Sequence, residues 1–438
     1  MAASRSVPTS RLSRFAKLGS LAGGVATNML IAGTKSTLTG NGWNNKDLLL
    51  QPKNIEKLAH QLAHLRGAAM KLGQLLSMDA GELLSPELTQ LLSLLRADAN
   101  PMPHNQLIKV LKTEWGDDWL NRFSHIELRP FAAASIGQVH LAHQENGQKL
   151  AVKIQYPGIA QSVNSDVDNV IALLNIARLI PKELDILPLV NEAKAQLLAE
   201  ADYEREAYYL KKYGELLAHN PHFKVPNVYI NHNTKRILAM EHVQATPIEA
   251  LQNLPQEEQN NIATHLIDLF FKEMFAFKLI QTDPNFANFH YQTQSKQIVL
   301  FDFGATREIS SKLSKAYLAL FIAGSENDRA GVLNAAREIG YFKDALIDSY
   351  KNHVIDLFLM ACEPLRTEGE FDFKNSQLAT HIKNAGLELS AQSQQWHTPP
   401  VDALFIHRKL AGLYLIAAKL NAKIDVTALI KPYSENRF

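Results

Sequence analysis

Two loops joined by an apolar strand constrain the fold of this chain more than any other feature. Asp283 and Asn288 lie five positions apart in the loop TDPNFAN, and Asp302-Phe303-Gly304 directly follows the apolar segment IVLF. The side chains of Asn288 and Asp302 offer oxygen ligands, which Mg²⁺ prefers when it binds beside phosphates. Asp283 can accept a proton from a hydroxyl or a water, or orient that nucleophile. The sequence therefore predicts a magnesium site next to a catalytic carboxylate.

An alanine-rich loop lies upstream of these two loops. The segment AAASIGQV aligns on Gly137 and Val139 with the pattern G-x-G-x-x-G-x-V, whose backbone N–H groups cover phosphates. Ala132 and Ala134 replace the first two glycines, and alanine restricts the backbone more than glycine does. We expect a nucleotide-binding loop with altered phosphate geometry, although the same residues also fit an ordinary hairpin. The predicted contacts are Ala132, Ala133, Ala134, Ser135, Ile136, Gly137, Gln138 and Val139.

Lys153 ends the segment LAVK, which has the composition of a strand. In protein kinases a lysine at this place holds the α- and β-phosphates of ATP and pairs with a glutamate on the following helix. The predicted helical run at 188–218 carries several acidic residues, and Asp202 and Glu206 can share a face because they are four apart. We select Glu206 as the partner of Lys153, while a solvated acidic helix face remains the alternative.

These motifs follow one another in the order that protein kinases show. Strands are predicted at 138–143, 149–155, 225–230, 236–240, 289–291 and 298–301, with a turn at 145–147 between the first two. Helices are predicted before Pro130, near 104–113, and again from 256 onward. The sequence therefore predicts an α+β fold, bilobal and protein-kinase-like, with an all-helical N-terminal extension.

The region after Asp302-Phe303-Gly304 departs from the protein-kinase pattern. No A-P-E motif follows, and the chain continues through ATREISSKLSKAYLALF into a predicted helix. We infer that the segment that normally docks a peptide substrate is missing or remodelled. A second departure is Gln281, which stands where kinases often have histidine.

The composition limits the kinds of partner and compartment. The chain has 438 residues, 46% of them hydrophobic and 20% charged, as expected of a globular protein with several structural units. Its formal net charge of +1 gives no field that would favour nucleic acid. Cys362 is the single cysteine, so the sequence excludes a disulfide framework, fits a reducing compartment and predicts a small core residue.

The N-terminal segment is basic and carries a helical apolar stripe. Leu18–Gly33 follows several basic residues and is too short and too rich in small residues to predict a membrane span. A docking helix and a basic amphipathic helix on an anionic membrane surface both fit, and a cleaved signal peptide fits least. We divide the chain into 1–45 (this segment and a linker), 46–130 (the helical extension), 131–242 (the strand-rich lobe with inserted helices) and 243–438 (the helical lobe).

The chain resembles the UbiB/AarF/ADCK family of atypical kinases, which is associated with ubiquinone (coenzyme Q) biosynthesis. The matching segments are KLGQ at 71–74, FAAASIGQVH at 131–140, Glu200-Ala201-Asp202, TDPNFAN, Asp302-Phe303-Gly304 and RKLAGLYLIAAKL at 408–420. Gln281, Asn285, Phe286 and Ala287 differ from the family pattern, whereas Asp283, Pro284 and Asn288 are retained. The N-terminal VPTSRLSRFAKLGSLAGG resembles the segment before the core in the coenzyme Q branch.

The resemblance implies an ATP site closed by the helical extension. Lys71 and Gln74 would project from one helix face, and Lys71 would meet the carboxylates of Glu200 and Asp202. Glu241 and Val243 would complete the nucleotide contacts.

The implied cofactors are ATP and Mg²⁺, and the implied function is an ATPase that supports ubiquinone biosynthesis at a membrane surface. Membrane lipids or quinone intermediates and other ubiquinone biosynthesis proteins are the implied partners. The implied location is cytoplasmic and peripheral on a bacterial inner membrane, or the matrix-side equivalent. A small-molecule or lipid kinase and a nucleotide-binding pseudokinase scaffold remain the alternatives.

Overall fold

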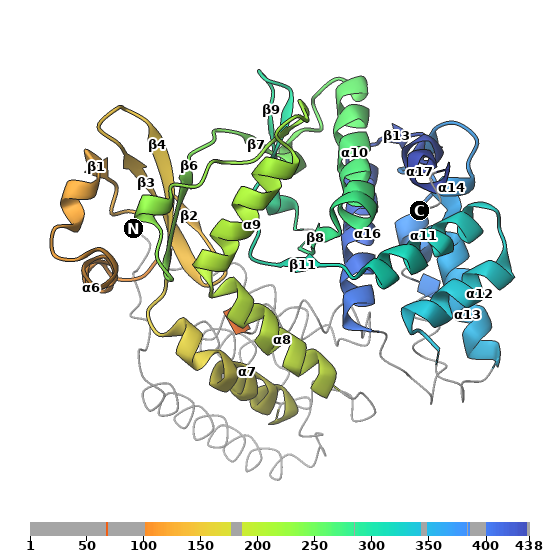
Figure 1. The fold of residues 1–438 in the computed structure, drawn as a ribbon, viewed down its shortest axis with the longest axis horizontal. Coiled ribbons are helices and arrows are strands. Elements are labelled where there is room, and N and C mark those ends of the chain that lie inside the picture. Colours follow the sequence, from red (N-terminus) through yellow and green to blue (C-terminus); the bar gives the residue numbers. More distant parts are fainter. Residues whose placement is uncertain are drawn as a thin grey trace, which may run out of the picture. The chain divides into compact units, whose positions relative to one another are not determined.

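The computed structural model divides the chain into two compact units, which Figure 1 shows element by element. It describes residues 67–68, 101–176, 186–283, 285–342, 348–382, 384–385 and 400–435. The first unit runs to Ala207 and includes Val228–His242, and the second holds Tyr208–Asn227 and the chain from Val243 onward. The predictions for the N-terminal segment and for Lys71 and Gln74 lie outside the described residues. No helix among those described has the length and apolar composition needed to cross a membrane.

The first unit is built on an antiparallel sheet. Its strands are β1 (His125–Ile126), β2 (Ala132–Ala133), β3 (Gly137–His143), β4 (Lys149–Gln155) and β6 (Ile237–Glu241). They pair in the order β1-β3-β4-β6, and β2 pairs with the beginning of β3. This confirms the two strands predicted around the turn at 145–147 and the strand predicted at 236–240.

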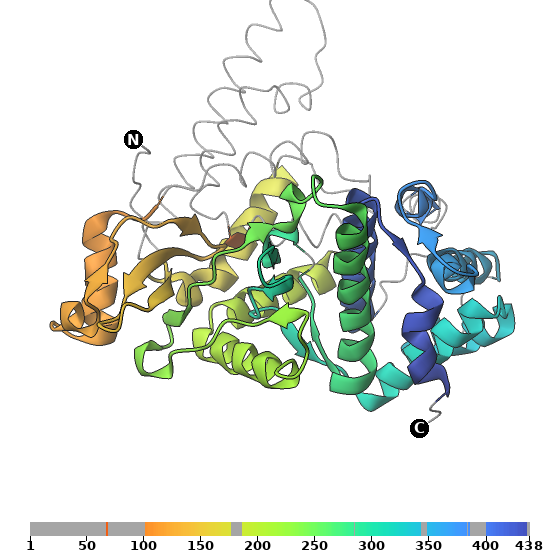
Figure 2. The same cartoon turned by 90° about the horizontal axis from the view of Figure 1, so that it is seen from above.

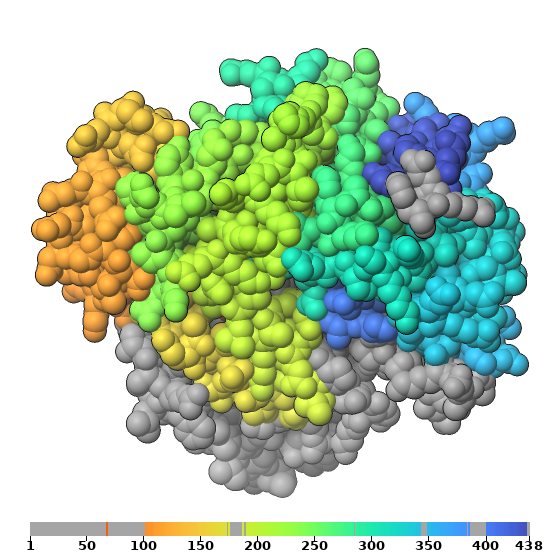
Figure 3. All heavy atoms as spheres, viewed as in Figure 1, coloured from red at the N-terminus to blue at the C-terminus, as the bar shows by residue number. Residues whose placement is uncertain are grey.

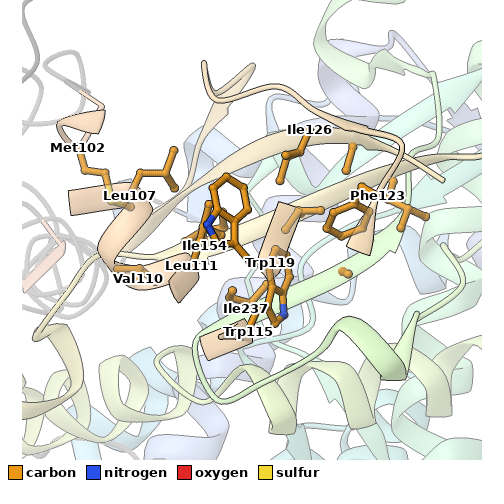
Figure 4. Close-up of a cluster of buried hydrophobic side chains, with 14 of the residues drawn as sticks. Met102, Leu107, Val110, Leu111, Trp115, Trp119, Phe123, Ile126, Ile154 and Ile237 are labelled. Atoms are coloured by element: carbon orange, nitrogen blue, oxygen red, sulfur yellow. The ribbon is translucent and has the colours of Figure 1, made fainter. Parts of the chain in front are cut away.

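One face of this sheet is apolar and packs against helix α6 (His104–Trp115) and the short helix η3 (Trp119–Arg122). Figure 4 shows the cluster, in which Trp115, Phe123 and Ile154 contribute large side chains. Strand residues alternate between faces, so Leu150, Val152 and Ile154 face α6 while their neighbours face the other side. The alternation therefore places Lys153 on the face opposite α6.

Three helices follow the sheet hairpin in the first unit. They are α7 (Ile159–Ile176), α8 (Leu187–Glu200) and α9 (Tyr203–Leu216), and the boundary between the units falls within α9. The prediction of one uninterrupted helix at 188–218 is wrong, because the chain breaks at Ala201-Asp202. The Asp202 carboxylate accepts a hydrogen bond from the Arg205 backbone N–H at 3.0 Å, which is the geometry of an N-cap on α9.

The strands of the second unit are short and alternate with its helices along the chain. They are β5 (Phe223–Lys224), β7 (Thr246–Pro247), β8 (Leu279–Gln281), β9 (Phe289–Gln292), β10 (Gln297–Leu300), β11 (Thr306–Glu308), β12 (Phe371–Asp372) and β13 (Lys423–Ile424). The predicted strands at 289–291 and 298–301 are confirmed as β9 and β10. The prediction of a strand at 225–230 is wrong, since β5 ends at Lys224, Val228 makes only an isolated bridge to Met240, and η4 (Ile230–His232) begins at Ile230.

Helices form the rest of the second unit, and α10 packs beside α16 in both ribbon views (Figures 1 and 2). Figure 3 shows that neighbouring segments cover most of α16 on the face in view. The α-helices are α10 (Gln256–Phe271), α11 (Ser311–Ser325), α12 (Arg329–Ile339), α13 (Asp348–Ala361), α14 (Glu363–Arg366), α16 (Val401–Lys419) and α17 (Val426–Glu435). Short helical turns are η4 (Ile230–His232), η5 (Ile248–Ala250), η6 (Lys272–Phe277) and η7 (Phe286–Asn288).

Cys362 lies in the packed helices of the second unit. It is buried, and a Cβ atom added to Gly324 would lie 2.5 Å from its sulfur. Burial raises the pKa of the Cys362 thiol to about 12, which keeps it protonated and unreactive. The prediction of a small core residue is confirmed.

Candidate functional site

Lys153 and Glu206 form a buried ion pair in the first unit. The Lys153 Nζ atom lies 2.8 Å from both carboxylate oxygens of Glu206, and the residues are only 7% and 2% exposed. Nζ also lies 5.1 Å from the centre of the Tyr203 ring. The contact predicted from the sequence is therefore present, and the catalytic roles of the two residues stay predictions.

The alanine-rich loop forms a tight hairpin between β2 and β3. The Ala134 N–H donates to the Gly137 carbonyl at 3.0 Å, while Ala132 and Ala133 are exposed. A Cβ atom at Gly137 would lie 2.5 Å from the Ile154 carbonyl oxygen and 2.9 Å from the Tyr203 hydroxyl. Glycine is therefore needed here for the close approach of strand β4.

Gln138 lies on the α6 face of the sheet, away from Lys153. Its side-chain oxygen Oε1 accepts from the Met102 N–H at 2.9 Å, and its Nε2 atom lies 2.8 Å from His140 Nε2. His140 Nδ1 in turn lies 2.8 Å from the Glu127 carbonyl oxygen. The Gln138 side chain thus joins the segment before α6 to the sheet, and the predicted nucleotide contact of Gln138 is restricted to its backbone.

Glu200 at the end of α8 contacts the alanine-rich loop directly. The Ser135 hydroxyl donates to Glu200 Oε2 at 3.0 Å. Asp202, by contrast, is exposed and caps α9, so it does not share the buried side of the helix with Glu206. Gly67 of the helical extension packs on the same loop, since a Cβ atom there would lie 3.3 Å from the Ser135 carbonyl oxygen.

The last strand of the sheet leads to the other predicted nucleotide contacts. Glu241 ends β6 opposite Leu150, and the His242 N–H donates to the Lys149 carbonyl at 3.0 Å. Val243 begins the next stretch of the second unit, and both Glu241 and Val243 are half-buried. Their contacts with a nucleotide stay predictions.

In the second unit, Asp283 is held through both its backbone and its side chain. The Asn288 side-chain N–H₂ donates to the Asp283 carbonyl at 3.1 Å. An Arg408 guanidinium N–H₂ donates to Asp283 Oδ1 at 3.1 Å, from the distant helix α16. The predicted catalytic residue and the predicted metal ligand Asn288 are thus in direct contact.

Gln281 connects the loop of Asp283 to the loop of Asp302. Its side-chain N–H₂ donates to the Asp283 carbonyl at 3.0 Å and to the Asp302 carbonyl at 3.1 Å. Asp302 has a left-handed backbone with φ of +57°, and its Oδ1 accepts from the Gly304 N–H at 3.1 Å. A further bond runs from the Phe301 N–H to the Asn288 carbonyl at 2.9 Å. The glutamine therefore fixes the two loops to one another.

A second buried ion pair supports Gln281. Lys409 Nζ lies 3.3 Å from Glu273 Oε2, and it donates to the backbone and side-chain oxygens of Gln281 at 2.9 and 3.2 Å. The Tyr213 hydroxyl donates to Glu273 Oε1 at 2.7 Å. Burial raises the pKa of Glu273, while Lys409 and the bond from Tyr213 oppose that change. Burial and the neighbouring carboxylate raise the pKa of Tyr213 well above its usual value.

The residues of these two loops fit a magnesium ion that is shared with phosphates. The Asn288 N–H₂ points to the Asp283 carbonyl, which leaves the Asn288 amide oxygen available as a ligand, and Asp302 offers a carboxylate. Within the described residues no group of three or more His, Cys, Asp and Glu side chains could hold a metal by itself. Protein sites often bind Mg²⁺ through one or two carboxylates together with phosphate oxygens.

Sequence reasoning missed the residues that support the loops from outside. Arg408 and Lys409 stand in the apolar helix α16, and Glu273 lies in η6. The available signal was the pair of cations at 408–409 inside an otherwise apolar helix, because buried charges need partners. The pattern does not say which loop those cations contact.

Known proteins resemble the chain along nearly its whole length. The profile of the ABC1 atypical kinase-like domain matches residues 94–336. "Atypical kinase COQ8, mitochondrial" of Saccharomyces cerevisiae is 38% identical over 431 residues, covering 98% of this chain and 85% of the yeast protein. "Atypical kinase COQ8B, mitochondrial" of Rattus norvegicus is 36% identical over 422 residues, covering 96% of this chain and 80% of the rat protein.

A solved structure shares the fold. The Rv3197–erythromycin complex from Mycobacterium tuberculosis has a TM-score of 0.58 at 24% identity, covering 86% of this chain and 95% of that chain. The predicted α+β kinase-like fold class is confirmed by the matching domain. The sequence similarity and the matching domain together establish that the chain belongs to the ABC1 family of atypical kinases, which is the UbiB/AarF/ADCK family.

Proposed function

We propose that this chain binds Mg-ATP, hydrolyses ATP and supports coenzyme Q biosynthesis at a membrane surface. The observation that carries the proposal is the buried pair of Lys153 and Glu206, with both distances at 2.8 Å. Kinases use such a pair to hold the α- and β-phosphates. The mitochondrial relatives named COQ8 and COQ8B support the biosynthetic role.

The proposed chemistry assigns one task to each loop. Asn288 and Asp302 would hold Mg²⁺, which when bound neutralises charge on the phosphates. Asp283 would orient a water, with its backbone fixed by Gln281 and Asn288. Glu241, Val243 and the alanine-rich loop would contact the nucleotide. The short connection from Gly304 to α11, which begins at Ser311, leaves little chain for a peptide-docking segment and favours water or a small acceptor over a protein substrate.

We further propose that Lys71 and Gln74 close the nucleotide site by meeting Glu200 and Asp202. The contact of Gly67 with the alanine-rich loop supports this proposal, because Gly67 precedes Lys71 by only four residues. Glu200 is already held at that loop by the Ser135 hydroxyl. In this arrangement the extension excludes a protein substrate from the phosphates.

Product analysis with γ-labelled ATP tests the reaction. We expect Mg²⁺-dependent release of labelled inorganic phosphate by the full chain, and a decrease of about 10²–10⁴-fold in Asp283→Asn because the nucleophile is no longer oriented. A labelled lipid or metabolite in place of phosphate would establish the small-molecule or lipid kinase instead. Mg-ATP binding without turnover in either protein would establish the pseudokinase scaffold.

Two further experiments test the membrane role and the role in coenzyme Q biosynthesis. We expect vesicles that contain anionic lipid to raise turnover of the full chain, and equal turnover with neutral and anionic vesicles contradicts the membrane role. Quinone profiling of a deletion strain tests the pathway. The parent is expected to restore coenzyme Q and Asp283→Asn is not, so restoration by both proteins contradicts an enzymatic role.

A further inference from the structure

Arg408 reaches the predicted catalytic carboxylate from 125 residues further along the chain. One guanidinium N–H₂ donates to Asp283 Oδ1 at 3.1 Å, and both side chains are largely buried. Among the described residues, no other side chain makes a hydrogen bond or an ion pair with that carboxylate. Charge-assisted hydrogen bonds are stronger than neutral ones, and a guanidinium holds a fixed plane.

The residues on either side of Arg408 fix the rotation of α16 about its own axis. His407 lies between the hydroxyls of Tyr317 and Tyr341, at 2.9 and 2.8 Å. Lys409 binds Gln281 on a different side of the helix, at 2.9 and 3.2 Å. Successive helix residues point about 100° apart, so these two fixed neighbours set the direction of Arg408.

The Asp283 backbone and its carboxylate are therefore held by separate groups. Gln281 and Asn288 bind the carbonyl oxygen, which fixes the position of the backbone. The Arg408 bond is to Oδ1, which restrains the rotation of the carboxylate and leaves Oδ2 outside this bond. A carboxylate must lie within hydrogen-bond reach of its nucleophile to act on it.

We propose that Arg408 is a positioning residue for the reaction, holding the Asp283 carboxylate so that Oδ2 orients the nucleophile. The inference rests on the proposed ATP turnover for its kinetic consequence, and on the structure alone for the ordering of the loop. Arg408 is not expected to contribute to nucleotide affinity, because its contact is with Asp283 and not with a phosphate-binding group.

Steady-state kinetics of the full chain test the proposal. For Arg408→Ala we expect kcat to fall about 10–100-fold with KM for ATP changed less than about 3-fold, since positioning acts on the chemical step. Arg408→Lys keeps the charge without the planar fork, and an intermediate kcat is expected. Guanidinium ion at concentrations well below its denaturing range should restore part of the Arg408→Ala activity, whereas urea should not.

Asp402→Asn is the matched control, because it removes the other arginine–aspartate contact of α16, to Arg307 at 3.0 Å. We expect this variant to keep the parental kcat. Hydrogen exchange supplies a readout that does not need turnover: exchange in the peptide covering 279–290 should rise in Arg408→Ala and stay parental in Asp402→Asn.

The outcomes separate the two proposals. Parental kcat and parental exchange in Arg408→Ala overturn the inference and leave ATP hydrolysis standing. If the parent itself releases no phosphate, the proposed function fails, and the exchange data alone decide whether Arg408 orders the loop. Equal kcat losses in Arg408→Ala and Asp402→Asn, with no restoration by guanidinium, assign Arg408 a merely structural role and overturn the inference.

Discussion

Among the described residues, each unit buries one lysine–glutamate pair, and the two pairs differ in their surroundings. Lys409 and Glu273 are each 1% exposed and lie in a network with Gln281 and Tyr213. Lys153 and Glu206 are slightly more exposed, and Nζ is equidistant from both carboxylate oxygens. We infer that the pair in the second unit completes the fold around the loops, whereas the pair in the first unit is the one to which the proposed function assigns phosphate binding.

Removing the two lysines should give the largest contrast. Lys409→Ala leaves Glu273 buried without its cation, and breaking such a pair costs about 3–5 kcal/mol of the free energy of unfolding. Lys153→Ala should cost less, about 1–3 kcal/mol, because its pair is less deeply buried. Denaturant unfolding measures both changes. Stabilisation of the fold by Mg-ATP should be lost in Lys153→Ala and retained in Lys409→Ala.

A double variant controls for the buried Glu273 charge that Lys409→Ala leaves without a partner. Lys409→Met combined with Glu273→Leu removes both charges and should recover part of the stability that Lys409→Ala loses, since well-packed apolar residues often replace a buried pair. Unfolding of Lys409→Ala at the parental denaturant concentration would contradict the structural role of the second pair.

Each unit also contains a buried histidine whose titration should change the free energy of unfolding at acid pH. Burial lowers the pKa of His407 from 6.5 to about 4, and it lowers the pKa of His140 in the first unit as well. Between pH 6.5 and about pH 4, His407 binds a proton in the unfolded chain but not in the folded chain. The free energy of unfolding therefore falls as the pH falls through this range. The loss is at most about 3.5 kcal/mol, since one pKa unit corresponds to about 1.4 kcal/mol.

His407→Gln isolates this contribution. Glutamine can still donate to one tyrosine and accept from the other, but it does not titrate. Its free energy of unfolding should therefore change less than that of the parent over the same acid range. Carboxylates titrate alike in both proteins and cancel in the difference. An identical pH slope for the two proteins would show that His407 is not a buried neutral histidine.

Three glycine substitutions should change the free energy of unfolding in the order of the space around each glycine. Gly137→Ala places a Cβ atom 2.5 Å from the Ile154 carbonyl, so we expect a loss of about 1–3 kcal/mol and weaker Mg-ATP binding. Gly67→Ala meets its nearest atom at 3.2 Å and should cost less. Gly214→Ala lies on α9 with its nearest atom at 4.0 Å, and a gain of about 0.5 kcal/mol is expected.

Calorimetric unfolding of the three variants, with and without Mg-ATP, measures the order. An equal loss in Gly137→Ala and Gly214→Ala would mean that strand β4 does not require the close approach at Gly137. If Gly67→Ala loses more free energy of unfolding than Gly137→Ala, the space around Gly67 is smaller than the space around Gly137, contrary to the distances.

The sequence predicted those parts of the site whose partners lie in a recognised order along the chain. Strands β3 and β4 follow from alternating apolar residues around a turn, and Lys153 and Glu206 follow from motif positions. The break at Asp202 was missed because a capping aspartate within a helical pattern looks like another acidic helix residue.

The contact between Arg408 and Asp283 could not be predicted in the same way. Local periodicity shows that α16 is buried, but it does not show which loop the helix packs against. The same limit applies to Gln138. Alternation shows which strand residues share its face of the sheet, but it does not show that α6 and the segment before it cover that face. The catalytic roles of the site residues stay predictions until the variants are measured.

The Gln281 side chain can bond to two loops at once because it has two N–H donors. Its amide group carries two N–H bonds, and each serves the carbonyl of a different loop. A neutral imidazole carries a single N–H, so a histidine at this position could serve only one of the two carbonyls unless it took up a proton. With glutamine, the connection between the loops of Asp283 and Asp302 does not depend on protonation at all.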